Sequence, residues 1–246
     1  MMNHHPTIHD IDTLRKSIQW FKTNRRQMRR PFVVISYAQS IDGSIATKDR
    51  RPLQISGQAA MVLTHTLRSL FDAILVGIDT VLADDPQLTV RLVQGKNPQP
   101  VVLDTHLRIP IESRLLQRSD CGSWLASSKF TSEARASGFT RTGATILRCQ
   151  LNSHGQIDIC QLMDILHSRG ICSLMVEGGA KVITSFINAG LVDLFIITIS
   201  PTLIDGLRVV QGRNESPLAK LNLVDIYYEQ LGNDLILWAR PDWNHR

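Results

Sequence analysis

The residues that point most directly to chemistry lie where glycines follow short apolar runs. Glu177, Gly178 and Gly179 come after the apolar run 173–176 and before a helix-like segment, 180–189. Two glycines let a ligand approach the backbone closely, and the first turn of a helix offers unpaired N–H groups and a positive dipole end. This arrangement suits a pyrophosphate, although two glycines also serve in a plain strand-to-helix turn. The presence of Glu177 favours the interpretation as a ligand site, because a carboxylate that ends an apolar strand is costly to desolvate without a partner.

Two further segments occupy a similar position after an apolar run. Residues 77–80 leave one such run and lead into Asp84 and Asp85, which precede Pro86. In an extended segment adjacent carboxylates point in opposite directions, so we interpret this pair as an Asx turn and as a poor acid/base dyad or metal site. Residues 40–43, Ser-Ile-Asp-Gly, have the composition of a turn and nothing more.

Several common catalytic signatures are missing from the chain. It has no P-loop, no G-x-G-x-x-G dinucleotide fingerprint, no G-x-S-x-G nucleophile elbow and no H-E-x-x-H zinc motif. The cysteines form no C-x-x-C pair, and no group of Cys and His has the spacing of a metal site. We therefore expect no bound metal and four reduced, mostly buried thiols: Cys121, Cys149, Cys160 and Cys172.

Short apolar runs alternate with helical periodicity, which is typical of an α/β protein with a mostly parallel central sheet flanked by helices. Strands are expected at 31–38, 72–77, 100–104, 123–127, 144–149, 173–176, 194–200, 224–229 and 234–240. Helices are expected at 10–22, 56–70 (with Ser56 as N-cap), 130–137, 158–170 and 180–189. The short turn between the last two strands predicts an antiparallel hairpin at the C-terminal edge. Because open parallel sheets bind ligands beyond the carboxyl ends of their strands, the glycine segments should meet there.

The composition is that of an ordinary globular protein, with 43% hydrophobic and 20% charged residues among 246. Five cations account for the whole formal net charge of +5, so no nucleic-acid-binding face is expected; they are Lys22, Arg25, Arg26, Arg29 and Arg30. We interpret residues 1–30 as an N-terminal helix and a solvated basic linker appended to a domain over 31–246, or alternatively as a tether for an anionic partner. No bilayer-spanning run or secretory signal is visible, so a cytoplasmic protein without a membrane partner is expected.

Three stretches, 40–47, 72–91 and 174–206, resemble the 5-amino-6-(5-phosphoribosylamino)uracil reductases of riboflavin biosynthesis, the RibD C-terminal-like family. The resemblance implies a dihydrofolate-reductase-like α/β fold and NADPH as cofactor. It implies hydride transfer from NADPH to C1′ of the ribosyl group, in its ring-opened imine form, which yields a ribitylamino product. A preceding deaminase domain would need H-x-E and P-C-x-x-C signatures. Neither occurs, so a stand-alone reductase is expected.

The resemblance also assigns site residues. It makes Glu177 the catalytic candidate, as an acceptor for sugar hydroxyls or ring amines rather than as an identified proton donor. Arg68 or Arg91 would hold the substrate phosphate by bidentate contacts. Substrate contacts are implied for Arg68, Leu88, Arg91 and Glu177. Cofactor contacts are implied for Ala38, Gln54, Thr80, Asp84, Gly178, Gly179, Ala180, Lys181, Val182, Ile183, Thr184 and Ser185, with Lys181 acting through its backbone.

The resemblance further implies a homodimer formed through the edge of the sheet. The aromatic residues Tyr227, Tyr228 and Trp238 of the C-terminal strands are candidates for that interface. The alternative is that these aromatic side chains pack inside the subunit.

One stretch departs from the family pattern S-x-W-[IV]-[TS] and reads 52–56, Pro-Leu-Gln-Ile-Ser. Pro52 stands in place of a serine that can bind substrate, and Gln54 in place of a tryptophan near the cofactor. The lost aromatic contact is worth roughly 1 kcal/mol. Two alternatives follow. One is a related pyrimidine or pterin reductase of altered specificity, and the other is a non-catalytic nucleotide-binding homologue that docks through its N-terminal helix and basic segment.

Overall fold

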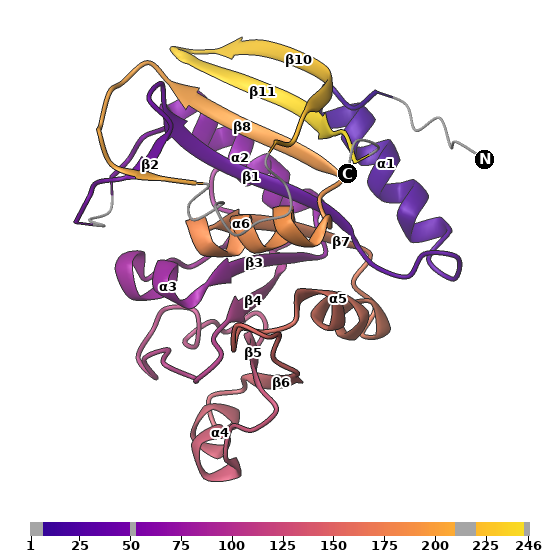
Figure 1. Ribbon diagram of the computed structural model, residues 1–246, viewed down its shortest axis with the longest axis vertical. Helices are drawn as coiled ribbons and strands as arrows, with labels where there is room; N and C mark the ends of the chain where they lie inside the picture. Colours follow the sequence, from indigo (N-terminus) through magenta and orange to yellow (C-terminus); the bar gives the residue numbers. More distant parts are fainter. Residues whose placement is uncertain (1–6, 50–52, 210–219, 244–246) are drawn as a thin grey trace.

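The computed structural model describes residues 7–49, 53–209 and 220–243, and within them the chain forms a nine-stranded sheet covered by helices (Figure 1). The strands follow the order β10-β11-β8-β1-β7-β3-β4-β5-β6. Their bounds are β1 (Phe32–Ser40), β3 (Ala73–Gly77), β4 (Gln99–Leu103), β5 (Trp124–Ser128), β6 (Thr145–Cys149), β7 (Ser173–Gly178), β8 (Leu194–Ser200), β10 (Leu223–Leu231) and β11 (Asp234–Pro241). The helices are α1 (Ile11–Thr23), α2 (Gln58–Leu70), α3 (Ile78–Asp84), α4 (Glu133–Thr140), α5 (Ile159–Ser168) and α6 (Ala180–Ala189).

The sheet is parallel from β8 to β6, and the hairpin β10–β11 adds an antiparallel edge beside β8. The fold class expected from the alternation of apolar runs is therefore confirmed. Strand β7 lies between β1 and β3, although it starts 133 residues after the end of β1 and 96 residues after the end of β3. The carboxyl ends of these three strands consequently meet at one edge, which brings together segments that are distant in sequence.

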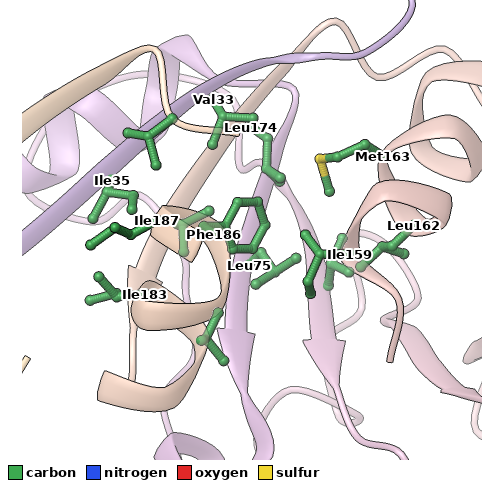
Figure 2. Close-up of a cluster of buried hydrophobic side chains, with 14 of the residues drawn as sticks. Val33, Ile35, Leu75, Ile159, Leu162, Met163, Leu174, Ile183, Phe186 and Ile187 are labelled. Atoms are coloured by element: carbon green, nitrogen blue, oxygen red, sulfur yellow. The ribbon is translucent and has the colours of Figure 1, made fainter. Parts of the chain in front are cut away.

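One face of the sheet is covered by α5 and α6. Figure 2 shows Phe186 and Ile187 of α6 and Leu162 and Met163 of α5 lying around strand residues such as Leu75, and all five side chains are buried. Successive side chains of a strand point to opposite faces of the sheet. Because helices cover both faces of this parallel sheet, each face has its own apolar layer. This packing fixes the start of α6 against the end of β7.

The opposite face carries α1 and α2 over the half of the sheet that includes β1, β8 and β11. Leu14 and Ile18 of α1 are 0% and 4% exposed, and they pack in one cluster with Phe32 and Trp238. The interpretation of this helix as an appendage is therefore wrong, because its apolar stripe completes the core. The division of the chain at residue 31 stays a prediction.

The basic segment that follows α1 is tied to the protein rather than forming a solvated linker. Lys22 pairs with Asp72 at 2.8 Å, and Arg30 makes two hydrogen bonds of 2.6 and 2.7 Å to Asp193. Arg25 donates to the backbone carbonyl of a residue near the end of α5, at 2.8 Å. Three of the five cations thus have partners within the chain.

Several expected elements differ in their details. The segment after β3 is the helix α3 and not an extended Asx turn, and its C-cap is Asp85 in the left-handed conformation. The N-cap of α2 is Gly57 rather than Ser56. Helix α4 begins at Glu133 instead of residue 130, because the Ser132 side chain accepts from the Arg135 N–H.

Two short strands, β2 (Ser44–Ala46) and β9 (Leu207–Arg208), were not expected and form a small separate sheet. Of the four free cysteines, Cys149 and Cys172 are buried, while Cys160 is exposed, so the thiols are not mostly buried. Within the described ranges, no helix combines the length and the apolar character needed to cross a membrane.

Candidate functional site

A cleft of about 1180 Å³ runs along the carboxyl edge of the sheet. Its floor is formed by the ends of β1, β7, β3 and β4, and its walls include the first turns of α3 and α6. At one end lie Tyr37 and Thr198, from β1 and β8, and at the other lie Leu103 and residues 155–157. The cleft is therefore long and crosses the central strands, as expected for a ligand site in an open parallel sheet.

The middle of the cleft is a turn built of glycines. Gly77 and Gly179 are the N-caps of α3 and α6, and neither helix has a side-chain cap. Gly178 has φ 143°, in a region that favours glycine. A Cβ on Gly77 would lie 2.7 Å from a methyl group of Val182, and one on Gly179 would lie 3.2 Å from the Thr80 hydroxyl. The glycines keep the backbone N–H groups at the start of α6 open to an anion.

Most of the residues expected to contact a cofactor line this cleft: Ala38, Gln54, Thr80, Asp84, Gly178, Gly179, Ala180, Lys181, Val182, Ile183 and Ser185. Thr184 is different, because its hydroxyl donates to the Val209 carbonyl at 3.1 Å and it does not line the cleft. Gln54 is exposed at the mouth, and its side chain amide lies 3.4 Å from the Ser56 carbonyl. Pro52, the other departure from the family pattern, lies outside the described residues.

Glu177 faces the cleft from the end of β7 and is held by Arg68 of α2. The guanidinium donates to both carboxylate oxygens, from Nε at 2.6 Å and from Nη2 at 2.7 Å. The third nitrogen of Arg68 donates to the Thr89 carbonyl at 3.1 Å. Burial would lower the pKa of Arg68, but the charge and hydrogen bonds of Glu177 outweigh it and raise that pKa. The planar fork of Arg68 is thus occupied in orienting Glu177.

A buried histidine supports the same corner of the site. His65 of α2 is 1% exposed, and its Nδ1 accepts a hydrogen bond of 3.0 Å from the Arg91 backbone N–H. Burial, followed by the nearby charges of Arg68 and Arg91, lowers the pKa of His65. The neutral imidazole therefore serves as an acceptor that pins the loop carrying Arg91.

The two remaining substrate candidates are placed differently. Leu88 is 2% exposed and packs in the apolar cluster around Val76, so a contact with substrate would have to come from its backbone. Arg91 is exposed, and its Nη1 donates to the Thr89 hydroxyl at 2.9 Å. Burial and then the Arg68 charge lower the pKa of Arg91. Of the two arginines, Arg91 is the one whose fork is not committed to Glu177.

Asp84 lies at the end of α3 and lines the cleft. Burial raises its pKa, and its carboxylate makes no hydrogen bond or ion pair with the residues that the structure describes. The neighbouring Asp85 instead accepts from the Arg114 N–H at 2.9 Å, outside the cleft. The two carboxylates are therefore separated by the end of a helix, not by an extended backbone.

The third segment, residues 40–43, is a structural anchor. The Asp42 carboxylate accepts hydrogen bonds from the hydroxyls of Ser40 and Ser44, at 2.5 and 2.8 Å. It also accepts from the N–H groups of Ile204 and Asp205. These hydrogen bonds, those from the two hydroxyls first, lower the pKa of Asp42. This residue ties two loops together and does not line the cleft.

One group of cleft residues was missed by reasoning from the sequence. The Asp79 carboxylate pairs with Arg108 at 3.1 Å and with Lys181 at 3.2 Å, and Thr105 and His106 lie beside them on the cleft wall. Burial raises the pKa of Asp79, but the hydrogen bonds from Lys181 and Arg108 outweigh it and lower that pKa. One signal in the sequence could have indicated this group: Thr105 and His106 directly follow residues 100–104, which were expected to form a strand.

The described residues contain no group of three or more His, Cys, Asp or Glu side chains arranged to hold a metal ion. The charged groups that line the cleft are instead the carboxylates of Glu177, Asp79 and Asp84 and the cations Arg108 and Lys181, beside the N–H groups of the helix starts. Such a site is suited to an anionic, dinucleotide-sized ligand beside a polar substrate.

The RibD C-terminal domain family matches residues 31–237. The 2,5-diamino-6-ribosylamino-4(3H)-pyrimidinone 5′-phosphate reductase of Archaeoglobus fulgidus is 34% identical over 224 residues, which cover 86% of this chain and 98% of the relative. A similar reductase of Methanothermobacter thermautotrophicus is 34% identical over 217 residues, 85% of this chain and 97% of the relative. The riboflavin biosynthesis protein RibD of Actinobacillus pleuropneumoniae is 32% identical over 219 residues, which cover 86% of this chain and 57% of that protein.

Two solved structures are similar over most of the chain. The RibD protein of Acinetobacter baumannii superposes with a TM-score of 0.78 at 25% identity, covering 94% of this chain and 63% of its own. The riboflavin biosynthesis reductase of Saccharomyces cerevisiae has a TM-score of 0.68 at 27% identity and covers 92% of this chain and 100% of its own. The chain thus spans less than two thirds of the RibD proteins and nearly the whole length of the shorter reductases.

Proposed function

The chain belongs to the RibD C-terminal domain family and is an oxidoreductase, and from this premise we propose that it is an NADPH-dependent reductase of riboflavin biosynthesis. Its reaction would reduce a phosphoribosylamino-pyrimidine to the ribitylamino compound. The observation that carries the proposal is the cleft in which Glu177, held by Arg68, lies beside the open glycine turn of α6. A substrate-binding group and a pyrophosphate cradle are thereby adjacent at one sheet edge.

The residues present fit the cofactor. Open space lies where a side chain of Gly178 would be, and a Cβ on Gly179 would press against the Thr80 hydroxyl. The first turn of α6 has no side-chain cap and offers its N–H groups to a pyrophosphate. When bound, the nicotinamide supplies the hydride for C1′ of the ribosyl group. The chain itself supplies binding, orientation and the exclusion of water. Ala38 and Thr198 form the wall on the β1 side of the glycine turn.

Glu177 acts on the substrate side. Each carboxylate oxygen accepts one hydrogen bond from Arg68 and keeps further lone-pair capacity for a sugar hydroxyl or a ring amine. Arg68 is a positioning residue in this scheme, because all three of its nitrogens already donate to protein atoms. The substrate phosphate is then assigned to Arg91, at the exposed end of the same network.

Two substrates are compatible with this site. One is 5-amino-6-(5-phosphoribosylamino)uracil, which the sequence resemblance implies. The other is the 2,5-diamino-pyrimidinone that names the two archaeal relatives, each of which this chain covers almost completely. The two compounds differ by an oxo or an amino group at C2 of the pyrimidine, so the order of reduction and deamination distinguishes them.

The test is the loss of NADPH absorbance with each of the two compounds, supplied in turn to the full chain. We expect substrate-dependent oxidation with at least one of them, and the better kcat/KM identifies the physiological order. If NADPH binds but neither compound is reduced, the proposed reaction is wrong, and the altered-specificity or non-catalytic alternatives gain support.

Glu177→Gln keeps the size of the side chain and removes its charge. We expect this variant to lower kcat/KM by at least about tenfold, because it weakens a charge-assisted contact to substrate, while the Kd for NADPH changes little. Glu133→Gln, at an exposed site paired with Arg148 near the far edge of the sheet, is the matched control. Unchanged kcat/KM in Glu177→Gln would show that the assignment of Glu177 is wrong.

We further propose that the chain forms a homodimer through its C-terminal edge. Tyr227 and Tyr228 of the edge strand β10 are 43% and 54% exposed, together with the neighbouring Ile226. Trp238 is completely buried and donates to Glu229 at 2.8 Å, so this aromatic belongs to the subunit interior. Sedimentation of the wild type and of Tyr228→Lys tests the proposal, which fails if both are monomers.

A further inference from the structure

The segment that carries Arg91, residues 89–91, is held by side chains from two different parts of the fold. It lies between α3 and β4 and is attached to the arginine that orients Glu177, because Arg68 also donates to the Thr89 carbonyl at 3.1 Å. The inference developed from this segment rests on the proposed function, in which Arg91 receives the substrate phosphate.

Two consecutive backbone N–H groups of the segment donate to side chains. The Arg91 N–H donates to Nδ1 of His65 at 3.0 Å, and the Val90 N–H donates to Oδ1 of Asn97 at 2.7 Å. His65 belongs to α2 and Asn97 to the loop before β4, so the two acceptors hold the segment from separate elements. Because both N–H groups are already paired, a phosphate at this segment would bind to the Arg91 guanidinium and not to these backbone groups.

The first acceptor is a buried, neutral imidazole. His65 is 1% exposed, and burial, followed by the charges of Arg68 and Arg91, lowers its pKa. The charge of Glu177 and the Thr89 backbone act in the opposite direction and do not outweigh these effects. A neutral ring can accept through Nδ1, whereas a protonated ring can only donate. The environment of His65 therefore preserves the hydrogen bond that holds the Arg91 backbone.

The second acceptor, Asn97, is oriented by an ion pair. Its Nδ2 donates to the Asp120 carboxylate at 2.8 Å, and Arg118 donates to both oxygens of that carboxylate, at 2.9 and 2.6 Å. The hydrogen bond from Arg118, before all other causes, lowers the pKa of Asp120, so this group stays an acceptor. A carboxylate on one side of the amide places Nδ2 there and leaves Oδ1 facing the Val90 N–H. The amide of Asn97 thus has one defined orientation.

The Arg91 side chain lies in a surplus of positive charge. It is exposed, and Nη1 donates to the Thr89 hydroxyl at 2.9 Å. Burial and the charges of Arg68 and Arg114 lower the pKa of Arg91, although the charge of Glu177 opposes them. A phosphate with two negative charges would relieve this repulsion and would accept the charge-assisted hydrogen bonds of a guanidinium.

We infer that His65 and Asn97 are positioning residues for the substrate phosphate. They fix the backbone at residues 90 and 91, and thereby the direction in which the Arg91 side chain leaves the chain. A guanidinium binds phosphate through a planar fork, so the strength of the contact depends on its orientation. Neither His65 nor Asn97 contacts the substrate in this scheme, because both act through Arg91.

The experiment measures KM and kcat for the pyrimidine that wild type reduces, supplied with its 5′-phosphate and after removal of the phosphate. His65→Leu removes the acceptor and leaves the Arg91 N–H without a partner. We expect it to raise KM for the phosphorylated compound by at least about fivefold while kcat changes by less than about twofold, because phosphate binding is lost before and after the reaction alike. The kcat/KM for the phosphate-free compound should stay that of wild type.

Asn97→Ala tests the same segment from its other side. Asn97 is exposed, so water can replace part of its hydrogen bond, and we expect a smaller rise in KM of the same kind. This variant also keeps the inference testable if His65→Leu does not fold.

Three further variants separate positioning from a general structural effect. His65→Asn supplies an amide oxygen that branches from Cγ as Nδ1 does, and it should restore much of the affinity for the phosphorylated compound. Adding His65→Leu to Arg91→Gln should raise KM little further, because the two residues act in one chain of contacts. His167→Gln is the matched control, since His167 lies away from the cleft and its Nε2 contacts the Arg25 carbonyl at 3.2 Å. Its KM should equal that of wild type.

The outcomes distinguish this inference from the proposed function. An unchanged KM in both His65→Leu and Asn97→Ala overturns the inference, and so does an equal loss with the phosphorylated and the phosphate-free compound. In either case the proposed reductase function stands. A wild type that binds NADPH and reduces neither pyrimidine overturns the proposed function and the inference together.

Discussion

The two ends of the cleft use the same pairing of arginine with carboxylate in different surroundings. At the end that contains Glu177, the side chains of Arg68 and Glu177 are 12% and 14% exposed and are joined by two short hydrogen bonds. At the other end Asp79 is 40% exposed, and its partners Arg108 and Lys181 are more exposed still. The types of charged residue are similar in the two groups, and their exposure differs.

The difference in burial determines what each group can do. A buried pair is costly to break, because removing either partner leaves a desolvated charge behind. An exposed pair exchanges readily with water and with other ions. Arg68 therefore fixes the direction of Glu177, whereas Arg108 and Lys181 remain able to leave Asp79 for another anion.

The largest effect should come from breaking the buried pair. Arg68→Met is expected to lower the free energy of unfolding by about 3–5 kcal/mol, because Glu177 would remain buried without its partner. Denaturant unfolding followed by circular dichroism measures the loss. The double variant Arg68→Met/Glu177→Leu should recover much of it, since no unpaired charge is left. A single variant as stable as wild type would contradict the buried character of this pair.

The next effect concerns pH at the same end. The pKa of His65 in the folded state lies below its ordinary value of 6.5, so below that pH the unfolded chain binds a proton that the folded chain resists. The free energy of unfolding should therefore decrease as pH falls below about 6.5. Above that pH, His65 should not contribute to the pH dependence of the free energy of unfolding.

Denaturant unfolding between pH 5 and about 8 tests this prediction. His65→Gln retains an acceptor for the Arg91 N–H and does not titrate, so its stability should vary less with pH. His154→Gln, at an exposed position, should keep the pH dependence of wild type. Identical profiles for wild type and His65→Gln would remove His65 as the cause.

The smallest effect on stability is expected from the exposed ion pairs around Asp79. Arg108→Gln and Lys181→Gln should each change the free energy of unfolding by less than about 1 kcal/mol, because exposed ion pairs contribute little. The same denaturation experiment measures this, with Arg148→Gln as the matched surface control. A loss as large as that of Arg68→Met would show that the two ends of the cleft do not differ in the way proposed.

Much of the fold was predictable from local patterns. Short apolar runs identified the central strands, and helical spacing of apolar residues identified helices such as α6, which covers residues 180–189 as expected. The short helix α3 was missed because its last residue, Asp84, and its C-cap, Asp85, precede a proline and have the composition of a turn. The packing of α1 was missed for a different reason: its apolar stripe is visible in the sequence, but the surface that it covers is not.

The candidate site was also predictable only in part. The glycine turn at 177–179 could be identified from its neighbours in the chain, because an apolar strand and a helix flank it directly. The partner of Glu177 could not be identified in this way, because Arg68 lies 109 positions earlier in the chain and contacts Glu177 only in the folded structure. The pairing of Asp79 with Lys181 spans 102 positions and has the same origin.

The sequence by itself determined the α/β class, the hairpin at the C-terminal edge and the glycine turn between β7 and α6. These features depend on residues that are close in the chain, so propensity and periodicity specify them. The tertiary structure alone decided that β7 lies between β1 and β3, which of two similar ion pairs is buried, and which arginine is committed to Glu177. Burial and long-range pairing depend on the strand order of the whole sheet, and no local pattern of residues encodes that order.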